Sequence, residues 1–211
     1  MFVKMDNPAY LLKIKKNQIR MMYDRGYYID ENDLILYNNY TDQDFINSGL
    51  ATPNAVSKMY VSEKRPSVFV LYLTTPKVKT LGVKETRDVI MQITNIPSTN
   101  NFILVTDVPF SSTAKTELDS LEAFNFQIFN SKELTYIPID NYLVPKHELL
   151  NLDEISKLVA NEKISKIPKI SIDDPISKYY GAMKGDVFRI HRVDLTGLQY
   201  VNKSISYRVV V

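Results

Sequence analysis

The stretch VFVLYL, residues Val68–Leu73, decides the fold of the first part of the chain, because it is an almost unbroken apolar run with the length of a buried β-strand. Two similar runs follow it, FILV at Phe102–Val105 and FQIF at Phe126–Phe129. The segments between them, Lys84–Thr94 and Ser111–Leu121, carry apolar residues at helical spacing. Alternating strands and helices with short connections form right-handed crossovers, so this pattern predicts a small, mostly parallel sheet with helices packed on it.

A further helix precedes this sheet. Apolar residues recur at helical spacing over Ala9–Asp24, and Gly26 suits the left-handed conformation that ends many helices. The basic residues of this helix are expected on a solvated face, with a nucleic-acid-binding face as the alternative: Lys13, Lys15, Lys16 and Arg20. The polar stretch Asn38–Lys64 is weakly patterned and predicts one or two short helices and a surface loop.

The last third of the chain is organised differently. Asn151 is a suitable N-cap for a helix over Leu152–Asn161. Asp174 followed by Pro175 is a strong start for a second, short helix, which Gly181 ends. These local signals predict two helices that are separated by an extended stretch.

A turn at Lys184–Gly185 and two strands, Val187–His191 and Ser204–Val211, complete this part of the chain. Residues 134–145 contain two prolines and little helical pattern, which predicts an extended linker. The expected fold is therefore α+β with two domains. A small N-terminal α/β domain with a mostly parallel sheet covers residues 1–140, and a small C-terminal α+β domain covers residues 141–211.

Composition excludes several classes of function. The 211 residues include no cysteine, which rules out disulfides, thiolate nucleophiles and cysteine-ligated zinc. The formal net charge of +2 is too small for a protein whose binding depends on phosphate contacts alone, so nucleic acid is expected only as a local or shared ligand. No apolar run approaches the ~20 residues of a membrane helix, and the N-terminus lacks a signal-peptide core. We therefore expect a soluble intracellular protein without membrane contact.

Catalytic signals are missing as well. The only histidines are His147 and His191, and neither has a nucleophile or metal ligand at a suitable spacing, so both are expected to be structural. The six glycines are scattered and form no phosphate loop. Asp173–Asp174 fits a helix cap better than a metal site. We expect no catalytic residue, metal, cofactor or small-molecule substrate.

Two other functions remain open from the residues themselves. A degenerate nuclease-like α/β enzyme would need Asp107, Glu117 or Asp119 to converge with a lysine, but a compact Asp–Glu–x–Lys pattern is missing. A free-standing DNA-binding protein would bind DNA tightly and with a steep dependence on salt. The tyrosine pairs Tyr27–Tyr28 and Tyr179–Tyr180 fit a core position plus a protein interface better than base stacking.

A composite of short motifs in the last third carries a family resemblance. It begins with LVPKHELL from Leu143, and its further parts are Ile167–Ile170, Asp174–Pro175, Tyr179–Gly181, Lys184–Val187, Ile190–Arg192 and Ser206–Val209. The order and spacing of these parts resemble the shared fifth subunit of eukaryotic RNA polymerases, a family that also has an archaeal member. The N-terminal part resembles this family more loosely.

The resemblance implies a non-catalytic subunit of a multisubunit DNA-dependent RNA polymerase. In this family the C-terminal assembly domain docks on the largest subunit and helps to build the lower jaw, and the N-terminal jaw domain projects toward downstream duplex DNA. The resemblance implies an interface made from these residues: Pro145, His147, Pro168, Asp174, Pro175, Tyr179, Gly181, Lys184, Gly185, Arg192, Tyr207 and Arg208. It also places Ser112 and Lys115 near DNA.

Two departures from the family pattern qualify these expectations. Residues 111–115 read Ser-Ser-Thr-Ala-Lys where the family tends to carry a Thr-Pro-Ser-Ala-like turn, so DNA contact is expected to be indirect or weak. The hairpin Val193–Ser206 is longer than in the family. Together with the Lys-, Asn- and Ile-rich composition, this divergence resembles the copy carried by a large cytoplasmic DNA virus, such as African swine fever virus. A viral chain would act in the host cytoplasm and the virion, and a cellular one in the nucleus.

Overall fold

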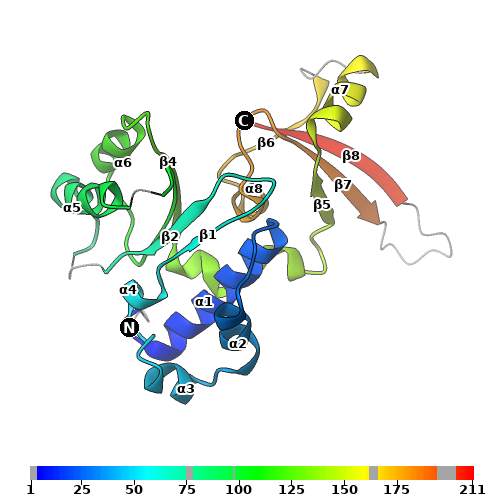
Figure 1. Ribbon diagram of the computed structural model, residues 1–211. Helices are drawn as coiled ribbons and strands as arrows, with labels where there is room; N and C mark the ends of the chain where they lie inside the picture. The colour runs from blue at the N-terminus through cyan, green and yellow to red at the C-terminus, as the bar shows by residue number, and fades with distance from the viewer. Residues whose placement is uncertain (1–3, 75–77, 97, 162–165, 194–202) are drawn as a thin grey trace. The chain divides into compact units, whose positions relative to one another are not determined.

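The computed structural model describes residues 4–74, 78–96, 98–161, 166–193 and 203–211, and its helices and strands form two compact units (Figure 1). The first unit covers residues 1–136 and the second residues 137–211. Each unit contains one four-stranded sheet and its own helices. This arrangement confirms the predicted α+β class.

The sheet of the N-terminal unit has the strand order β1-β2-β3-β4. Its strands are β1 (Lys58–Tyr60), β2 (Val68–Tyr72), β3 (Asn101–Thr106) and β4 (Asn125–Asn130). The strands β2, β3 and β4 are parallel, and β1 pairs antiparallel with β2. The mostly parallel sheet was therefore predicted correctly, but β1 was not, because its three residues form no apolar run.

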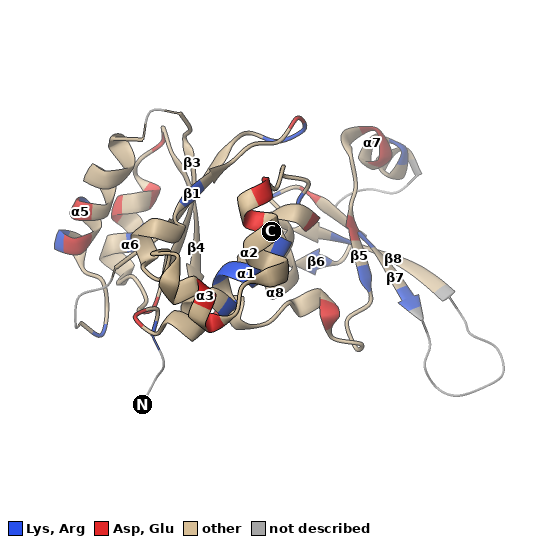
Figure 2. Ribbon diagram, turned by 60° about the horizontal axis from the view of Figure 1, so that its bottom comes forward, with Lys and Arg blue, Asp and Glu red and all other residues tan. Residues whose placement is uncertain are grey.

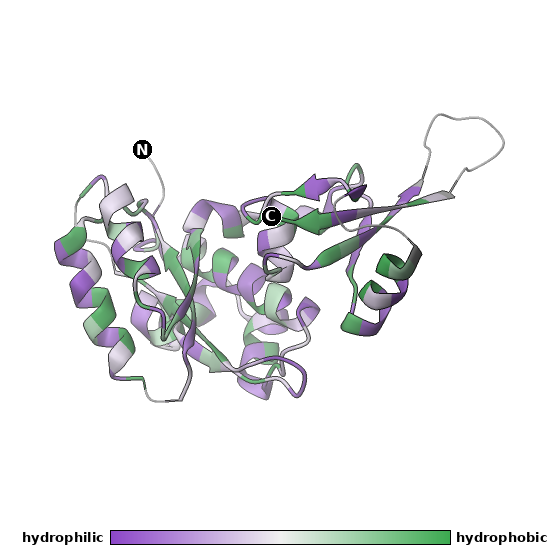
Figure 3. Cartoon of the chain, turned by 90° about the horizontal axis from the view of Figure 1, so that it is seen from above, coloured by the Kyte–Doolittle hydropathy of each residue, from purple (hydrophilic) through white to green (hydrophobic). Residues whose placement is uncertain are grey.

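Helices cover both faces of this sheet. The helices α5 (Val83–Thr94) and α6 (Ser112–Asp119) bury Val89, Ile93 and Leu118 against the face that carries Leu71 and Leu104. Helix α1 (Pro8–Asp24) covers the other face, as the hydrogen bond between the Tyr72 hydroxyl and Gln18 shows. Hydrophobic colouring runs along the central strands between these layers (Figure 3).

Three short helices follow α1, and two of them lie within residues 38–64, where one or two short helices and a surface loop were predicted. They are α2 (Glu31–Asn39), α3 (Asp42–Asn47) and α4 (Pro53–Val56). Each begins with a side chain that accepts a hydrogen bond from the first helical turn, and these caps are Asp30, Thr41 and Thr52. Capping therefore defines these helices, even though their apolar periodicity is weak. The unit ends with the 3₁₀ helix η1 (Ser131–Thr135).

The sheet of the C-terminal unit has the order β5-β7-β8-β6. Its strands are β5 (Lys146–Leu149), β7 (Val187–Val193), β8 (Lys203–Val210) and β6 (Lys169–Ile170). Neighbours β5, β7 and β8 are antiparallel, and β6 is parallel to β8. The predicted extended linker over residues 134–145 instead contains the end of η1 and the 3₁₀ helix η2 (Pro138–Asp140). Residues 194–202, which form most of the long hairpin connection, lie outside the described part of the chain.

The two predicted helices of this unit are present as α7 (Leu152–Asn161) and α8 (Pro175–Tyr180). The Asp174 side chain caps α8 by accepting from the Ile176 N–H at 2.8 Å, and Gly181 ends it at a φ of 61°. Core side chains lie on both sides of the sheet. One cluster includes Phe188 and Ile176 of α8, and the other packs Val187 against Leu158 of α7. Within the described ranges, no helix combines the length and apolar character that crossing a membrane requires.

Candidate interaction surfaces

The predicted interface residues of the C-terminal unit differ in their exposure. The exposed ones are Pro168, Pro175, Lys184, Gly185 and Arg192. The half-buried ones are Pro145, Asp174, Gly181, Tyr207 and Arg208. The buried ones are His147 and Tyr179. Residues of the first two groups can contact a partner directly, whereas the buried pair stabilises the unit that presents them.

His147 belongs to the core of the C-terminal unit. Its Nδ1 donates a 2.6 Å hydrogen bond to the carbonyl of Pro145, and its ring meets Phe188 edge-on at 5.7 Å between centroids. Burial lowers the pKa of the His147 imidazole. A neutral, hydrogen-bonded ring in this position has a structural role, in agreement with the sequence interpretation.

A chain of charges crosses the α7 side of the same sheet. Glu148 Oε2 accepts a 2.9 Å hydrogen bond from His191 Nε2, and its Oε1 lies 2.5 Å from Lys146 Nζ. Arg189 joins this group to α7 through a 3.0 Å ion pair with Glu154. The Lys146 ammonium, and after it His191, holds the pKa of the Glu148 carboxyl at about 2. These contacts fix β5, β7 and α7 together, so His191 also has a structural partner.

Tyr207 and Arg208 face opposite sides of the sheet, because successive strand residues alternate. The register pairs Tyr207 with Arg189 on the α7 side and Arg208 with Phe188 on the α8 side. Both residues were predicted to contact a partner subunit, but a partner that lies on one side of the sheet would contact only one of them.

The candidate DNA-proximal residues lie on the first turn of α6. Ser112 and Lys115 are both exposed, and Ser111 caps the helix by accepting from the Ala114 N–H at 3.2 Å. The start of α5 lies beside it, since Leu81 N donates to Pro109 O and Ser111 N donates to Leu81 O, both at 2.9 Å. The N-termini of α5 and α6 are therefore adjacent at the carboxyl ends of β2 and β3. The Glu85 carboxylate already accepts from the Gly82 N–H at 2.9 Å at the start of α5, so an anion is favoured only at the start of α6, beside Lys115.

The carboxylates of the nuclease-like alternative do not share a site. Asp107 accepts hydrogen bonds from the Met5 N–H at 3.0 Å and the Ser131 hydroxyl at 2.6 Å. These bonds hold the residues that precede α1 against the end of β3. Glu117 instead pairs with Arg87 at 3.1 Å. Within the described residues, no group of three or more histidines and carboxylates is arranged to hold a metal ion.

The prediction that Lys15 lies on a solvated face of α1 is wrong, because Lys15 is only 2% exposed. Its Nζ donates to Gln18 Oε1 at 3.0 Å, to the carbonyl of Val56 at 3.1 Å and to the Tyr60 hydroxyl at 2.9 Å. Asp33 Oδ1 lies 4.0 Å from the same ammonium group. Burial lowers the pKa of Lys15 to about 8, and the Asp33 carboxylate opposes this shift.

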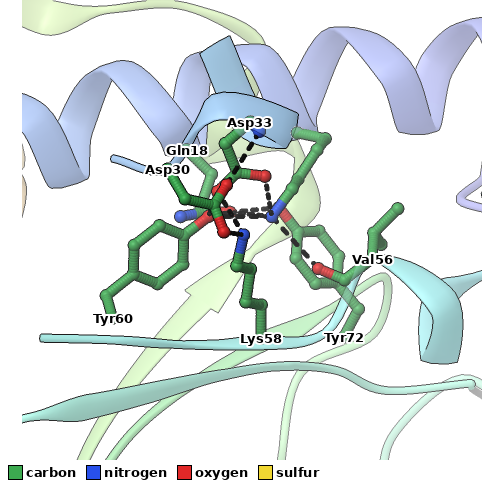
Figure 4. A network of polar contacts seen from close by, with 8 residues as sticks. Gln18, Asp30, Asp33, Val56, Lys58, Tyr60 and Tyr72 are labelled. Atoms are coloured by element: carbon green, nitrogen blue, oxygen red, sulfur yellow. Dashed lines mark hydrogen bonds and ion pairs between the residues drawn. The ribbon is translucent and has the colours of Figure 1, made fainter. Parts of the chain in front are cut away.

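Further polar groups complete this buried network (Figure 4). The Tyr60 hydroxyl donates to Asp33 Oδ2 at 2.7 Å, and Lys58 Nζ lies 3.4 Å from the same oxygen. The Tyr72 hydroxyl donates to Gln18 Oε1 at 3.3 Å. Burial raises the pKa of both tyrosine hydroxyls, so they stay protonated and act as donors.

A signal for the buried lysine was present in the sequence. Lys15 follows Leu11 by four residues and precedes Ile19 by four, so it lies within the apolar stripe of α1. Charge alone suggested a solvated face, but position on the helix decides which basic residue is buried. Lys13 is exposed as expected, and Lys16 reaches the Tyr40 carbonyl at 2.9 Å.

Known proteins match both parts of the chain. The family model described as RNA polymerase Rpb5, C-terminal domain, matches residues 138–210. The DNA-directed RNA polymerases I, II and III subunit rpabc1 of Dictyostelium discoideum is 29% identical over 98% of this chain and 100% of its own length. The subunit 5-like protein 1 of Arabidopsis thaliana is 27% identical, over 92% of this chain and 94% of its own length. The subunit Rpo5 of Archaeoglobus fulgidus is 45% identical, over 34% of this chain and 92% of its own length.

These matches define a class of proteins, the subunits of DNA-directed RNA polymerases. Within that class, the chain belongs to the family of RNA polymerase subunit 5, known as Rpb5 in eukaryotes and Rpo5 in archaea. The resemblance seen in the motifs from Leu143 onward is thereby confirmed at the level of the family.

Proposed function

We propose that this chain is a non-catalytic assembly subunit of a multisubunit DNA-dependent RNA polymerase. The observation that carries the proposal is the family match over residues 138–210, which spans almost the whole C-terminal unit of residues 137–211. Matches along nearly the full chain to a polymerase subunit of Dictyostelium discoideum support the same role for both units.

In this proposal the two units have different partners. The C-terminal assembly domain, residues 141–211, docks on the largest polymerase subunit and on other subunits near it. Its exposed residues Pro168, Lys184 and Arg192 are available for such contacts. The N-terminal jaw domain, residues 1–140, forms part of the lower jaw and lies near downstream DNA.

The DNA contribution of the jaw domain is weak or indirect. The exposed residues Ser112 and Lys115 lie at the start of α6, whose N-terminus favours phosphate, while the Glu85 carboxylate at the adjacent start of α5 opposes it. The first turn of α6 carries one basic side chain, and the whole chain has a net charge of +2. A few phosphate contacts at most are therefore expected, which is too few for tight binding by the free chain.

Affinity purification of the tagged chain from its native source tests the proposal. We expect the large polymerase subunits to co-purify in near-equal amounts, and recovery of the chain alone would refute the assignment. Two assays on the pure chain address the alternatives. Robust magnesium-dependent DNA cleavage would favour the nuclease-like enzyme, and tight duplex binding at physiological salt would favour a free-standing DNA-binding protein.

We further propose that the chain is the copy encoded by a large cytoplasmic DNA virus. The Lys-, Asn- and Ile-rich composition and the altered residues 111–115 support this origin. Detection of the chain by mass spectrometry in purified virions, together with the large polymerase subunits, is the expected result. Detection only in the nuclei of uninfected cells would contradict it.

A further inference from the structure

Helix α2 buries a carboxylate and exposes aliphatic side chains, the reverse of an ordinary surface helix. Asp33 is only 5% exposed, and Leu36, three residues later on the same side of the helix, is buried with it. The Asp33 carboxylate is held inward by the Tyr60 hydroxyl at 2.7 Å. Leu34 and Ile35 consequently point outward and are 45% and 40% exposed.

Helix α3 has a similar exposed aliphatic residue. It buries Phe45 completely and leaves Ile46 47% exposed. Only Tyr40 and Thr41 separate the two helices, and both helices contact α1 (Figure 1). Single exposed aliphatic residues are common, but three of them on two consecutive helices with the same support form a surface that suits a partner.

Carboxylates lie beside these aliphatic residues. Glu31 precedes Leu34 by three residues and Ile35 by four, and Asp42 precedes Ile46 by four, so each carboxylate shares a side of its helix with them. Within the described ranges, neither Glu31 nor Asp42 has an ion pair or a side-chain hydrogen bond. We call these five residues the α2–α3 face.

The α2–α3 face is negatively charged. Residues 30–47 include five acidic residues and no basic one, and Figure 2 shows acidic residues in red on α3. The nearby ammonium groups are already engaged. Lys58 pairs with Asp30 and lies 3.4 Å from the buried Asp33, and Lys16 donates to the Tyr40 carbonyl at 2.9 Å. The counter-charge for Glu31 and Asp42 must therefore be supplied by a partner.

We infer that the α2–α3 face binds a segment of another protein that carries lysine or arginine beside apolar side chains. This inference goes beyond the proposed function and does not depend on it. Burial of Leu34, Ile35 and Ile46 against the apolar side chains supplies affinity. The basic side chains of the segment pair with Glu31 and Asp42, which adds specificity and speeds association.

The charge of this face disfavours other occupants. Phosphate groups of nucleic acids and of anionic membranes carry the same sign of charge as Glu31 and Asp42, so both are repelled. A second copy of the chain related by a two-fold axis would place the α2–α3 face against itself. Like charges would then be opposed, which is costly in an interface. A basic partner protein is the occupant that satisfies both the apolar and the charged residues.

The test measures binding of a fluorescent probe to the full chain by fluorescence anisotropy. The probe is a short amphipathic helical peptide of leucine and lysine, and the comparison peptide has glutamate in place of lysine. We expect Leu34→Gln/Ile35→Gln/Ile46→Gln to bind the probe about tenfold more weakly than the wild type. Asp88→Asn/Met91→Gln, which removes an exposed carboxylate and an exposed apolar residue from α5, is the matched control and should bind as the wild type does.

The charged residues are tested by salt. Added salt should weaken binding of the probe to the wild type, and this dependence should be smaller for Glu31→Gln/Asp42→Asn. Equal binding of the two peptides by the wild type, or equal binding of the probe by the wild type and the triple Gln variant, would refute the inference. So would a dimer in sedimentation velocity, or binding to phosphatidylserine vesicles or duplex DNA, that the triple Gln variant abolishes.

All substituted side chains are exposed, so the thermal unfolding midpoint should stay at its wild-type value. Should the triple Gln variant unfold, Glu31→Gln/Asp42→Asn decides the matter alone. An affinity and a salt dependence equal to those of the wild type would then refute the inference.

Discussion

The hydroxyl of Tyr60 donates a 2.7 Å hydrogen bond to Oδ2 of Asp33, and this bond joins the edge strand β1 to helix α2 inside the N-terminal unit. The same hydroxyl accepts from the buried ammonium of Lys15 on α1. Three elements that are distant in sequence therefore meet at one polar point. A buried ion pair contributes little net stability, but removing one partner is costly because the other charge stays buried.

Asp33→Asn should strongly destabilise the N-terminal unit. Lys15 would lose its nearest carboxylate, and Lys58 would lose one of its two, so a loss of about 3 kcal/mol in the free energy of unfolding is expected. This loss is measured by denaturant unfolding of the full chain, with circular dichroism as the probe of unfolding. Asp88→Asn, which removes an exposed carboxylate from α5, is the matched control and should cost no more than about 0.5 kcal/mol. Equal costs for the two variants would show that the network does not stabilise the unit.

Replacing Lys15 by methionine should change the pH dependence of stability. The folded pKa of Lys15 is about 8, below its ordinary value of 10.5, so the unfolded chain binds more protons between these values. The free energy of unfolding of the wild type should therefore rise with pH in this window, relative to Lys15→Met, by up to about 1.4 kcal/mol per pH unit. The comparison with Lys15→Met cancels the titration of other groups.

The groups around Lys15 set its pKa and therefore the pH dependence that this comparison measures. They are Gln18 on α1, Asp30 and Asp33 at α2, the Val56 carbonyl of α4, Lys58 and Tyr60 on β1, and Tyr72 on β2. Asp33→Asn should cost much less in the Lys15→Met background, because no buried ammonium is then left unpaired. Identical pH profiles for the wild type and Lys15→Met would contradict a lowered lysine pKa.

Glu148→Gln should remove a stabilising interaction that the wild type itself loses at acid pH. The folded pKa of Glu148 is about 2, below the ordinary 4.5. The Glu148 carboxylate therefore contributes fully to the free energy of unfolding above pH 4.5, and this contribution is lost as the pH falls through about 2. The effect is small, since the side chain is about one-third exposed and water screens the charges. Thermal unfolding midpoints of the wild type and Glu148→Gln should differ near pH 6 and converge toward pH 2. A constant difference across this range would exclude the ionic contribution.

Local signals explain which parts of the fold could be predicted from sequence. Asp174, Pro175 and Gly181 each act on the backbone next to them, and together they define α8 correctly. The strands β1 and β5 are short and carry charged residues, so their pairing depends on neighbours that sequence reading does not place.

The candidate sites also divide into features set by local sequence and features set by contacts between distant residues. Ser112 and Lys115 were correctly placed at a helix start, because the hydroxyl cap is a local signal. The burial of Lys15 and the shared face of Arg192 and Arg208 depend on packing and strand register, which connect residues far apart in the chain. The resemblance named Arg192, Tyr207 and Arg208, and strand alternation already separates Tyr207 from Arg208, but only the register shows that Arg192 and Arg208 share a face.

Replacing residues on β8 should weaken polymerase assembly more than replacing the exposed lysine of α6. Tyr207→Ala/Arg208→Ala alters both faces of a strand in the C-terminal unit, whereas Lys115→Ala removes one charge from the N-terminal unit. We expect about a tenfold loss of co-purified largest subunit for the first variant and little change for the second. Lys115→Ala should instead slightly reduce the salt-sensitive retention of downstream DNA by the assembled polymerase. The reverse order of effects on assembly would show that the roles of the two domains are exchanged.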